Sequence, residues 1–337
     1  MYLVHFYNNI KKSLSMTTRR TFFKQTSVLA TGLLLSQSCM TPTATAKKVK
    51  QIGLQLYTLR DELTKDVKGS IAQLGQIGFN HLETYFDYEG ATGKKLFWGL
   101  TAKELKTLMT DNKLLTHSGH YQLNDFLTAG NGKDDALKFQ LDLAAQLGQT
   151  YFVVPVPPAG TWDKLTAENY KFMSVQFNKA GEICQKAGLK FAYHNHYWEF
   201  KPLVGTKTGF DIMMAETDPK LVDFELDLFW ATKAGVDPVS LFQKYPKRIV
   251  MWHIKDMDKS KTEPVYSAAT PSPAMGDVFR SIKFAEVGTG AINFKEIFKH
   301  KEDLKYYFVE QDQITLPNKF DSVKMSFDYI NNTLLNA

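Results

Sequence analysis

The stretch Ala167–Asn195 decides the fold, and it reads AENYKFMSVQFNKAGEICQKAGLKFAYHN. Apolar side chains recur with helical period in its first part, which predicts a helix over Ala167–Ala187. Gly188 follows, as expected of a residue that ends a helix. The next run, Leu189–Asn195, is short and apolar, which is typical of a buried strand. The stretch therefore predicts one helix–strand unit of an α/β protein.

The same alternation of short apolar runs and helical segments continues on both sides of this stretch, from Lys50 onward. Helices are predicted over Ala102–Asp111 and Ala136–Leu147, and Gly78 and Gly148 mark helix ends. Eight βα units in about 290 residues favour a single (β/α)8 TIM barrel over residues 50–335. The eight runs predicted as strands are Ile52–Tyr57, His81–Tyr85, Leu114–Ser118, Tyr151–Pro155, Leu189–Asn195, Val222–Asp227, Ile249–Ile254 and Tyr306–Glu310.

An open, doubly wound sheet is the alternative fold for this pattern. It commonly carries a G-x-G-x-x-G turn after its first strand, and none stands there. Gly288-Thr289-Gly290 comes late in the chain and lacks the third glycine. Lys259–Ala285, which is rich in proline and serine, is predicted as a long loop between the last two strands, of the kind that covers an active-site mouth.

Composition and charge exclude several classes of protein. The 337 residues are 44% hydrophobic, which is too apolar for a disordered chain, and two cysteines, Cys39 and Cys184, make neither a disulfide framework nor a Cys-rich zinc module. The net charge of +6 arises at the front, because residues 1–39 hold five basic residues and no acidic ones. The rest of the chain is nearly neutral, so we expect no nucleic-acid partner.

The N-terminal segment has the pattern of an export signal. Arg19 and Arg20 precede a short apolar run, Val28–Leu35, and the combination resembles a twin-arginine signal. The run is far shorter than the roughly 20 residues of a membrane-spanning helix, so no transmembrane span is expected. We therefore predict that residues 1–46 are a signal and linker, and that the protein is exported to the periplasm or anchored as a lipoprotein at Cys39. Lipidation at Cys39 stays open.

Ionisable residues stand near the ends of the predicted strands. Parallel strands of a barrel end at one mouth, so these side chains are expected to meet there although they are distant in sequence. Each alone has an ordinary structural explanation, but an accident at six strand ends is much less plausible. They are Glu83, His117, His120, His194, His196, Glu199, Glu225, Asp227, His253, Lys255, Asp256, Glu310 and Asp312.

Carboxylates combined with imidazoles predict an open site for a divalent metal, which could be manganese, iron, cobalt, nickel or zinc. Because residues i and i+2 of a strand share a face, His194 and His196 face the same way, as do Glu225 and Asp227. Asp227 is nearer the carboxyl end of its strand and was therefore preferred over Glu225. Asp227 is thus predicted as a metal ligand with His253 and Glu310, and the fifth strand supplies a fourth.

Four motifs in this order resemble the xylose-isomerase-like TIM barrel family of sugar phosphate isomerases and epimerases. They are Tyr193-His194-Asn195-His196-Tyr197-Trp198-Glu199-Phe200, Glu225-Leu226-Asp227-Leu228-Phe229-Trp230-Ala231, Trp252-His253-Ile254-Lys255-Asp256-Met257 and Val309-Glu310-Gln311-Asp312. The resemblance covers about residues 50–335. It implies a barrel with one divalent ion, often manganese, held at the ends of strands five to eight.

The resemblance implies that Asp227, His253 and Glu310 correspond by position to metal ligands of the family. It also aligns His194 with a glutamate that binds metal and moves a proton in the epimerases. Trp230 stands where those enzymes have a substrate-contacting histidine. A neutral imidazole still binds metal, but it changes the charge and the proton-transfer options of the site.

The chemistry expected here takes place beside a sugar carbonyl, where a metal polarises oxygen and a side chain removes the neighbouring proton. Glu199, His196 and Glu310 are predicted to transfer protons, and Lys255 to stabilise an oxyanion. Glu83, His120, Trp198 and Trp230 are predicted to bind substrate. Trp98, Trp162 and Trp252 complete the set of tryptophans that offer ring faces to a pyranose, although most are expected to belong partly to the core.

Export favours a free sugar, a keto-sugar or an oxidised glycoside over a phosphorylated sugar. The first hypothesis is therefore a metal-dependent sugar isomerase or epimerase. A lyase or hydrolase acting on a 3-keto-glycoside shares the same first step and stays open. A sugar-binding protein without catalysis and an endonuclease for abasic DNA, which the same superfamily includes, are the remaining alternatives. A homodimer is a further expectation.

Overall fold

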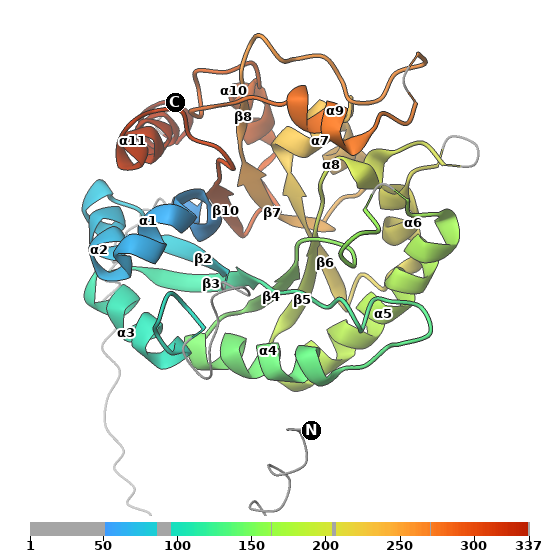
Figure 1. Ribbon diagram of the computed structural model, residues 1–337, viewed down its shortest axis with the longest axis horizontal. Helices are drawn as coiled ribbons and strands as arrows, with labels where there is room; N and C mark the ends of the chain where they lie inside the picture. Colours follow the sequence, from blue (N-terminus) through green and yellow to red (C-terminus); the bar gives the residue numbers. More distant parts are fainter. Residues whose placement is uncertain (1–50, 86–95, 163, 204–206, 270, 336–337) are drawn as a thin grey trace, which may run out of the picture. The chain divides into compact units, whose positions relative to one another are not determined.

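Eight parallel strands close into a barrel in the order β1-β10-β7-β6-β5-β4-β3-β2. Each strand pairs with its neighbours in the chain, and β1 closes the circle by pairing with β10. The predicted TIM barrel is therefore confirmed, and helices surround the strands (Figure 1). The barrel strands are β1 (Gly53–Gln55), β2 (His81–Tyr85), β3 (Leu115–His120), β4 (Tyr151–Val154), β5 (Lys190–His194), β6 (Val222–Asp227), β7 (Ile249–Ile254) and β10 (Tyr306–Val309).

This computed structural model describes residues 51–85, 96–162, 164–203, 207–269 and 271–335. The predicted signal over residues 1–46, with Cys39, lies outside them, so export and lipidation stay predictions, as does the homodimer. Among the described residues no helix has the length and apolar character that crossing a membrane requires. Cys184 is buried as a free thiol.

All eight predicted strands exist, and three have the predicted bounds. The largest difference lies in the first, which was expected over Ile52–Tyr57 but stops at Gln55. The side-chain oxygen of Gln55 accepts a hydrogen bond from the backbone N–H of Tyr57, which turns the chain into the 3-10 helix η1 (Leu56–Leu59). A side chain capping its own backbone competes here with strand propensity.

The helices lie on the outside of the barrel. The predicted helices are confirmed to within one residue as α3, α4 and α5, and Gly78, Gly148 and Gly188 have the positive φ angles of left-handed helix ends. The helices are α1 (Arg60–Lys65), α2 (Val67–Ile77), α3 (Ala102–Asp111), α4 (Asp135–Leu147), α5 (Ala167–Lys186), α6 (Gly209–Glu216), α7 (Leu228–Lys233), α8 (Pro238–Lys244), α9 (Met275–Arg280), α10 (Phe294–Ile297) and α11 (Lys319–Tyr329), with the short turns η2 (Trp198–Phe200), η3 (Phe298–His300) and η4 (Ile330–Leu334).

A small apolar cluster fills the barrel beneath its polar end. Its members are buried and separate from the main core between barrel and helices. Ala192 belongs to it and shares a face of β5 with His194, and Met251 shares a face of β7 with His253. The polar residues at the mouth therefore rest on a dry layer, and the barrel is no pore. The cluster consists of Tyr151, Val153, Ala192, Val250, Met251 and Phe308.

The insertion between β7 and β10 differs from the predicted loop. Residues 259–285 contain α9 and the strand β9 (Phe284–Ala285), which pairs antiparallel with β8 (Asp256–Met257). The ammonium of the buried Lys233, at the end of α7, donates to the carbonyls of Lys261 and Glu263. The insertion is thus docked on the barrel by backbone pairing and by a lysine that the sequence pattern did not single out.

Asp256 fixes the return of the chain after β9. Its carboxylate accepts hydrogen bonds from the backbone N–H groups of Met257, Gly288, Gly290 and Ile292, at 2.8 to 3.1 Å. A Cβ on Gly290 would lie 2.3 Å from Asp256 Oδ1 and 2.4 Å from the carbonyl oxygen of Met257. Only glycine lets the backbone approach this closely.

We therefore predict that Gly290→Ala lowers the free energy of unfolding by about 1–3 kcal/mol, because the methyl group pushes the loop off Asp256. Urea unfolding followed by circular dichroism measures the change. The control is Gly276→Ala in α9, whose added Cβ would come no closer than 3.4 Å to the Arg280 side chain. Equal stability of the two variants would refute the close-approach argument.

Candidate functional site

Acidic and imidazole side chains from six of the barrel strands meet at the carboxyl end of the barrel. Strand register brings them together, because His194 pairs with Glu225 across β5 and β6, and Asp227 pairs with His253 across β6 and β7. All are buried or nearly so. They are Glu83 on β2, His120 on β3, His194 on β5, Glu225 and Asp227 on β6, His253 on β7 and Glu310 directly after β10.

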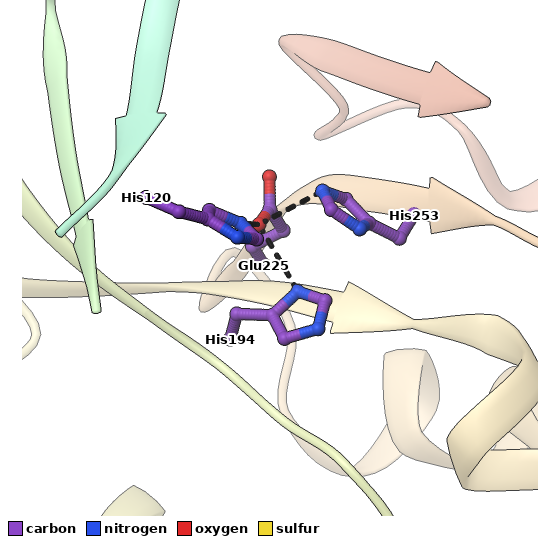
Figure 2. Close-up of side chains that lie close together, drawn as sticks. All are labelled: His120, His194, Glu225 and His253. Carbon is purple, nitrogen blue, oxygen red and sulfur yellow. Dashed lines mark hydrogen bonds and ion pairs between the residues drawn. The ribbon is translucent and has the colours of Figure 1, made fainter. Parts of the chain in front are cut away.

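The deeper part of this group is centred on Glu225. Its Oε2 atom lies 3.0 Å from Nε2 of His120, 3.1 Å from Nδ1 of His194 and 3.2 Å from Nε2 of His253 (Figure 2). We call His120, His194, Glu225 and His253 the inner set. One ligand atom from each lies within 4.8 Å of the others, so the four could hold a metal ion. Glu83 adjoins them, with its Oε2 2.6 Å from Nε2 of His253.

A second group of donors, the outer set, consists of Asp227, His253 and Glu310, whose ligand atoms also lie within 4.8 Å of one another. Nδ1 of His253 is 2.6 Å from Glu310 Oε2, and Nε2 of His194 is 3.7 Å from Asp227 Oδ2. His253 and His194 therefore direct one ring nitrogen to each set. The ammonium of Lys255 stands between Asp227 and Glu310, at 3.0 and 2.8 Å.

The four predicted metal ligands, His194, Asp227, His253 and Glu310, are thus neighbours in space. Asp227 Oδ2 is buried and has no hydrogen-bond partner among the described atoms, because its contact with Lys255 lacks hydrogen-bonding geometry. A buried carboxylate oxygen that accepts no hydrogen bond and lies near imidazole nitrogens is a chemically suitable place for a divalent cation, although here it also pairs with the ammonium of Lys255. The donor atoms of this chain therefore fit a metal, although they do not identify it.

The histidines of the site differ in the direction in which their surroundings shift the pKa. Burial opposes a charge on His120, but Glu83 and Glu225 overcome this and raise its pKa to about 9. His253 behaves alike: its pKa is raised by Glu225, Glu310 and Glu83 against the effect of burial. Burial lowers the pKa of His194, and neighbouring His253 adds to the effect. His194 is therefore neutral at pH 7, the form in which an imidazole binds metal.

Burial and the neighbouring charges also shift the pKa values of the carboxylates. Burial raises the pKa of Asp227 to about 6, with Lys255 opposing it. Burial would also raise the pKa of Glu310, but Lys255 and His253 outweigh it and hold that pKa below the usual range. The pKa of Lys255 is raised because Asp227, Asp312 and Glu310 overcome its burial, so its ammonium stays charged.

A cavity of about 630 Å³ opens above these donors. Its floor includes His120, His194, Lys255 and Glu310, and the insertion contributes Phe279, Ile282 and Phe284. The predicted covering of the mouth by this segment is therefore confirmed for those side chains. The other lining residues are Tyr57, Arg60, Tyr85, Gln122, Pro155, Val156, Trp162, His196, Trp198, Trp230, Asp312 and Gln313.

Most predicted site residues meet at this cavity. His196, Lys255 and Glu310, predicted to be catalytic, line it, as do His120, Trp198 and Trp230, predicted to bind substrate. Nδ1 of His196 is buried and has no hydrogen-bond partner among the described atoms. Trp98 and Trp252 do not line the cavity; Trp252 packs on Phe242 outside the barrel.

Four predicted site residues do not line the cavity: Glu83, Glu199 and the two predicted metal ligands Asp227 and His253. Glu199 is fully buried, accepts a hydrogen bond from the Tyr193 hydroxyl at 2.5 Å, and accepts another from the backbone N–H of His196 at 2.8 Å. It therefore positions the end of β5 and does not face a substrate. Glu83 lies below the mouth, where Gln55 and His253 hold its Oε2 atom.

Sequence reasoning missed the central place of Glu225 and the role of Asn195. Glu225 shares a face with Asp227, which was the available signal, but its greater depth was taken as a reason to set it aside. Asn195 Oδ1 accepts a hydrogen bond from the backbone N–H of Asp227, and its amide donates to the carbonyl of His196. It thus ties β6 to the residues that follow β5. His117 stacks on Tyr306 away from the cavity.

Residues 71–312 match the family model described as the xylose isomerase-like TIM barrel. This stretch is well over half of the chain, so the protein belongs to that family, as the four motifs suggested.

The names of similar proteins limit the types of reaction to be considered for this chain. An inosose dehydratase of Geobacillus kaustophilus (strain HTA426) is 30% identical over 178 residues, which cover 52% of this chain and 56% of that protein. The match thus spans little more than half of the relative. A crystal structure of a sugar phosphate isomerase/epimerase from Parabacteroides distasonis ATCC 8503 is 28% identical, with a TM-score of 0.69 over 86% of this chain and 96% of that one.

The structure of the IolI protein with a bound zinc atom shares the fold at 14% identity, with a TM-score of 0.61, covering 85% of this chain and 98% of that one. The names of the first two relatives agree with the expectation of an enzyme that acts on carbohydrates or related polyols, by isomerase, epimerase or lyase chemistry.

The environment of Glu199 yields a prediction about stability and pH. Burial raises its pKa to about 7 in the folded protein, against the usual 4.5. Between these values the folded state holds a proton that the unfolded state has lost, so this carboxyl makes the protein less stable as pH rises from 4.5 to 7. The loss is on the order of 3 kcal/mol and is complete above pH 7.

We therefore expect Glu199→Gln, which cannot titrate, to become more stable relative to the wild type as pH rises from 5 to 8. Urea unfolding of both proteins at these two pH values measures the difference. A constant difference between variant and wild type would mean that Glu199 does not hold a proton in the fold.

Proposed function

We propose that this protein is a divalent-metal-dependent enzyme that removes a proton from the carbon beside a carbonyl of a sugar or cyclitol, as an isomerase or epimerase. The observation that carries the proposal is the convergence of buried imidazole and carboxylate donors at the floor of a cavity. Membership of the family and the names of its relatives support it.

The metal is assigned to the outer set together with His194. Glu310 and His194 line the cavity, so a ligand there is within reach of a substrate. The inner carboxylates then act as supports, because Glu225 lies 3.1 Å from the far nitrogen of His194 and Glu83 lies 2.6 Å from the far nitrogen of His253. Histidines that bind metal usually hold a carboxylate at their second nitrogen in this way.

The protein's own groups supply the remaining chemistry. A bound divalent ion would polarise the carbonyl and stabilise negative charge on its oxygen. His196 is the proposed base, because its side chain lines the cavity and because burial, together with Lys255, lowers its pKa and keeps its imidazole neutral, the form that accepts a proton. Lys255, whose ammonium is anchored by Asp227, Glu310 and Asp312, stabilises the developing oxyanion.

A lyase is the second candidate, because one relative is named an inosose dehydratase. Both reactions begin with loss of the proton beside the carbonyl. In the lyase the electron pair then expels an oxygen substituent from the next carbon, and that oxygen takes up a proton. Asp312, at the cavity wall, is the candidate donor, since burial raises its pKa against the opposing effect of Lys255.

Metal analysis of the purified protein tests the assignment. After reconstitution with manganese or zinc, we expect about one ion per chain in the wild type and none in Asp227→Ala or His253→Ala, because each removes a ligand. Glu225→Gln is expected to bind metal about 10 to 100 times more weakly, as a support and not a ligand. Asp223→Asn is the matched control on β6, where the carboxylate contacts Tyr151.

The same samples are then incubated with inosose, with ketohexoses and with 3-keto-glucose. Turnover that disappears with the metal supports the proposal, and the product distinguishes epimerisation from elimination. Full turnover by metal-free protein would overturn it. Loss of metal in Glu225→Gln but not in Asp227→Ala would move the ion to the inner set.

A further inference from the structure

The cavity has a charged floor and an apolar outer wall. The floor holds His194, Lys255 and Glu310, whereas Tyr57, Trp162 and Phe279 lie among the apolar residues of the wall. A volume of about 630 Å³ is in the range of sites that bury drug-sized ligands, roughly 300 to 1,000 Å³. The space therefore exceeds the needs of a single six-membered sugar ring placed on the floor.

Three aromatic rings form a stacked row along one side of the cavity. His196 stacks on Trp198 with ring centroids 4.4 Å apart and planes 9° apart, and Trp198 stacks on Trp162 at 5.2 Å and 17°. The indole N–H of Trp162 donates to the carbonyl of Pro157 at 3.0 Å, which fixes its ring. The row begins beside His194, whose ring centroid is 5.1 Å from that of His196, and ends at the half-buried Trp162.

Two apolar side chains at this cavity are left exposed to solvent. Phe279 on α9 is 52% exposed and Tyr57 in η1 is 40% exposed, and both line the cavity. Exposed aromatic surface around a cavity is a sign of a binding site, because it costs free energy until a ligand covers it. Trp162 and Phe279 come from different segments of the chain, so the apolar wall belongs to the cavity as a whole.

The charges at the cavity disfavour a phosphoryl group. The ammonium of Lys255 already lies within 3.1 Å of Asp227, Glu310 and Asp312. The guanidinium of Arg60 lies over the ring of Tyr57, 4.4 Å from its centroid, and donates to its carbonyl. The third cation of the lining, His120, contacts Glu83 and Glu225. A phosphate dianion bound here would face these carboxylates, and the residues that line the cavity include no cluster of unpaired arginines to balance its charge.

We propose that this cavity binds an unphosphorylated keto-glycoside, with the oxidised sugar on the floor and a ring of the attached aglycone against the wall of Trp162 and Phe279. This inference rests on the proposed function for the chemistry at the floor and adds the class of substrate. The half-buried ring of Trp162, which is held in place by stacking on Trp198 and by its hydrogen bond to Pro157, supplies a preformed surface for an aromatic or saturated ring, which binds there at little entropic cost.

Calorimetric titration with three ligands tests the proposal: 4-nitrophenyl 3-keto-glucoside, 3-keto-glucose and 3-keto-glucose 6-phosphate. We expect the aryl glycoside to bind at least about tenfold more tightly than 3-keto-glucose, since a stacked ring contributes about this factor, and the phosphate to bind no more tightly. Trp162→Ala and Phe279→Ala should each weaken the aryl glycoside severalfold to tenfold and leave 3-keto-glucose within about twofold.

Phe139→Ala is the matched control, because Phe139 on α4 is also 52% exposed but does not line the cavity. Phe279→Ala guards against a folding defect of Trp162→Ala, since it alters an exposed side chain. Equal affinity for the aryl glycoside and the free keto-sugar, or tighter binding of the phosphate, would overturn the inference.

Proton exchange at the carbon beside the carbonyl, followed in the same samples, separates this inference from the proposed function. Exchange with 3-keto-glucose but no preference for the aryl glycoside would remove the apolar subsite and leave the function standing. Trp162-dependent binding of the aryl glycoside without exchange in any ligand would keep the subsite and remove the function.

Discussion

The imidazole of His253 is held by two carboxylates at once, Glu310 at Nδ1 and Glu83 at Nε2, each 2.6 Å away. Its side chain is fully buried, so no water screens these contacts. One ring therefore joins the deeper carboxylates to those that border the cavity. The arrangement of the site depends on this link, because moving His253 would remove the shortest ionic contact of a buried carboxylate on each side.

The site as a whole gathers more acids than cations. Lys255 and His120 are the buried positive groups that a metal bound to His253 would leave in place, and the carboxylates around them outnumber them. Burying charge is costly unless the charges are paired, so the surplus carboxylate creates a place for a cation. The carboxylates in this count are Glu83, Glu225, Asp227, Glu310 and Asp312. This balance is the physical reason for proposing a divalent metal at this site.

The sequence predicted the barrel well because its strands and helices are locally consistent. The run Ile249–Ile254 is apolar apart from His253, since both faces of this strand are buried, whereas Val222–Asp227 alternates apolar and acidic residues. The bounds of both strands match the prediction. Positions at the ends of the predicted strands also indicated that His194, Asp227, His253 and Glu310 lie at the mouth. Strand identity and facing are properties of short stretches, and short stretches can be analysed without a structure.

The depth of each side chain in the barrel and the residues that it contacts could not be predicted in the same way. Whether Glu225 or Asp227 meets the histidines depends on the register between strands, which is set by packing around the closed barrel. Glu199 was expected to face substrate, but the turn η2 directs it to Tyr193 and the backbone of His196. The pairing of β8 with β9 joins residues across an insertion rich in proline and serine, where local pattern carries no information about the partner.

The central claim is that a group on this protein removes a proton from the carbon beside a carbonyl. The most direct test is turnover of inosose and of 3-keto-glucose by the metal-loaded protein in deuterium oxide, with deuterium at that carbon followed by nuclear magnetic resonance and mass spectrometry. The account predicts that deuterium enters recovered substrate or epimerised product at this carbon, that an elimination instead loses the original hydrogen from it, and that neither occurs in Asp227→Ala. Product formed with the original hydrogen retained at that carbon would contradict it.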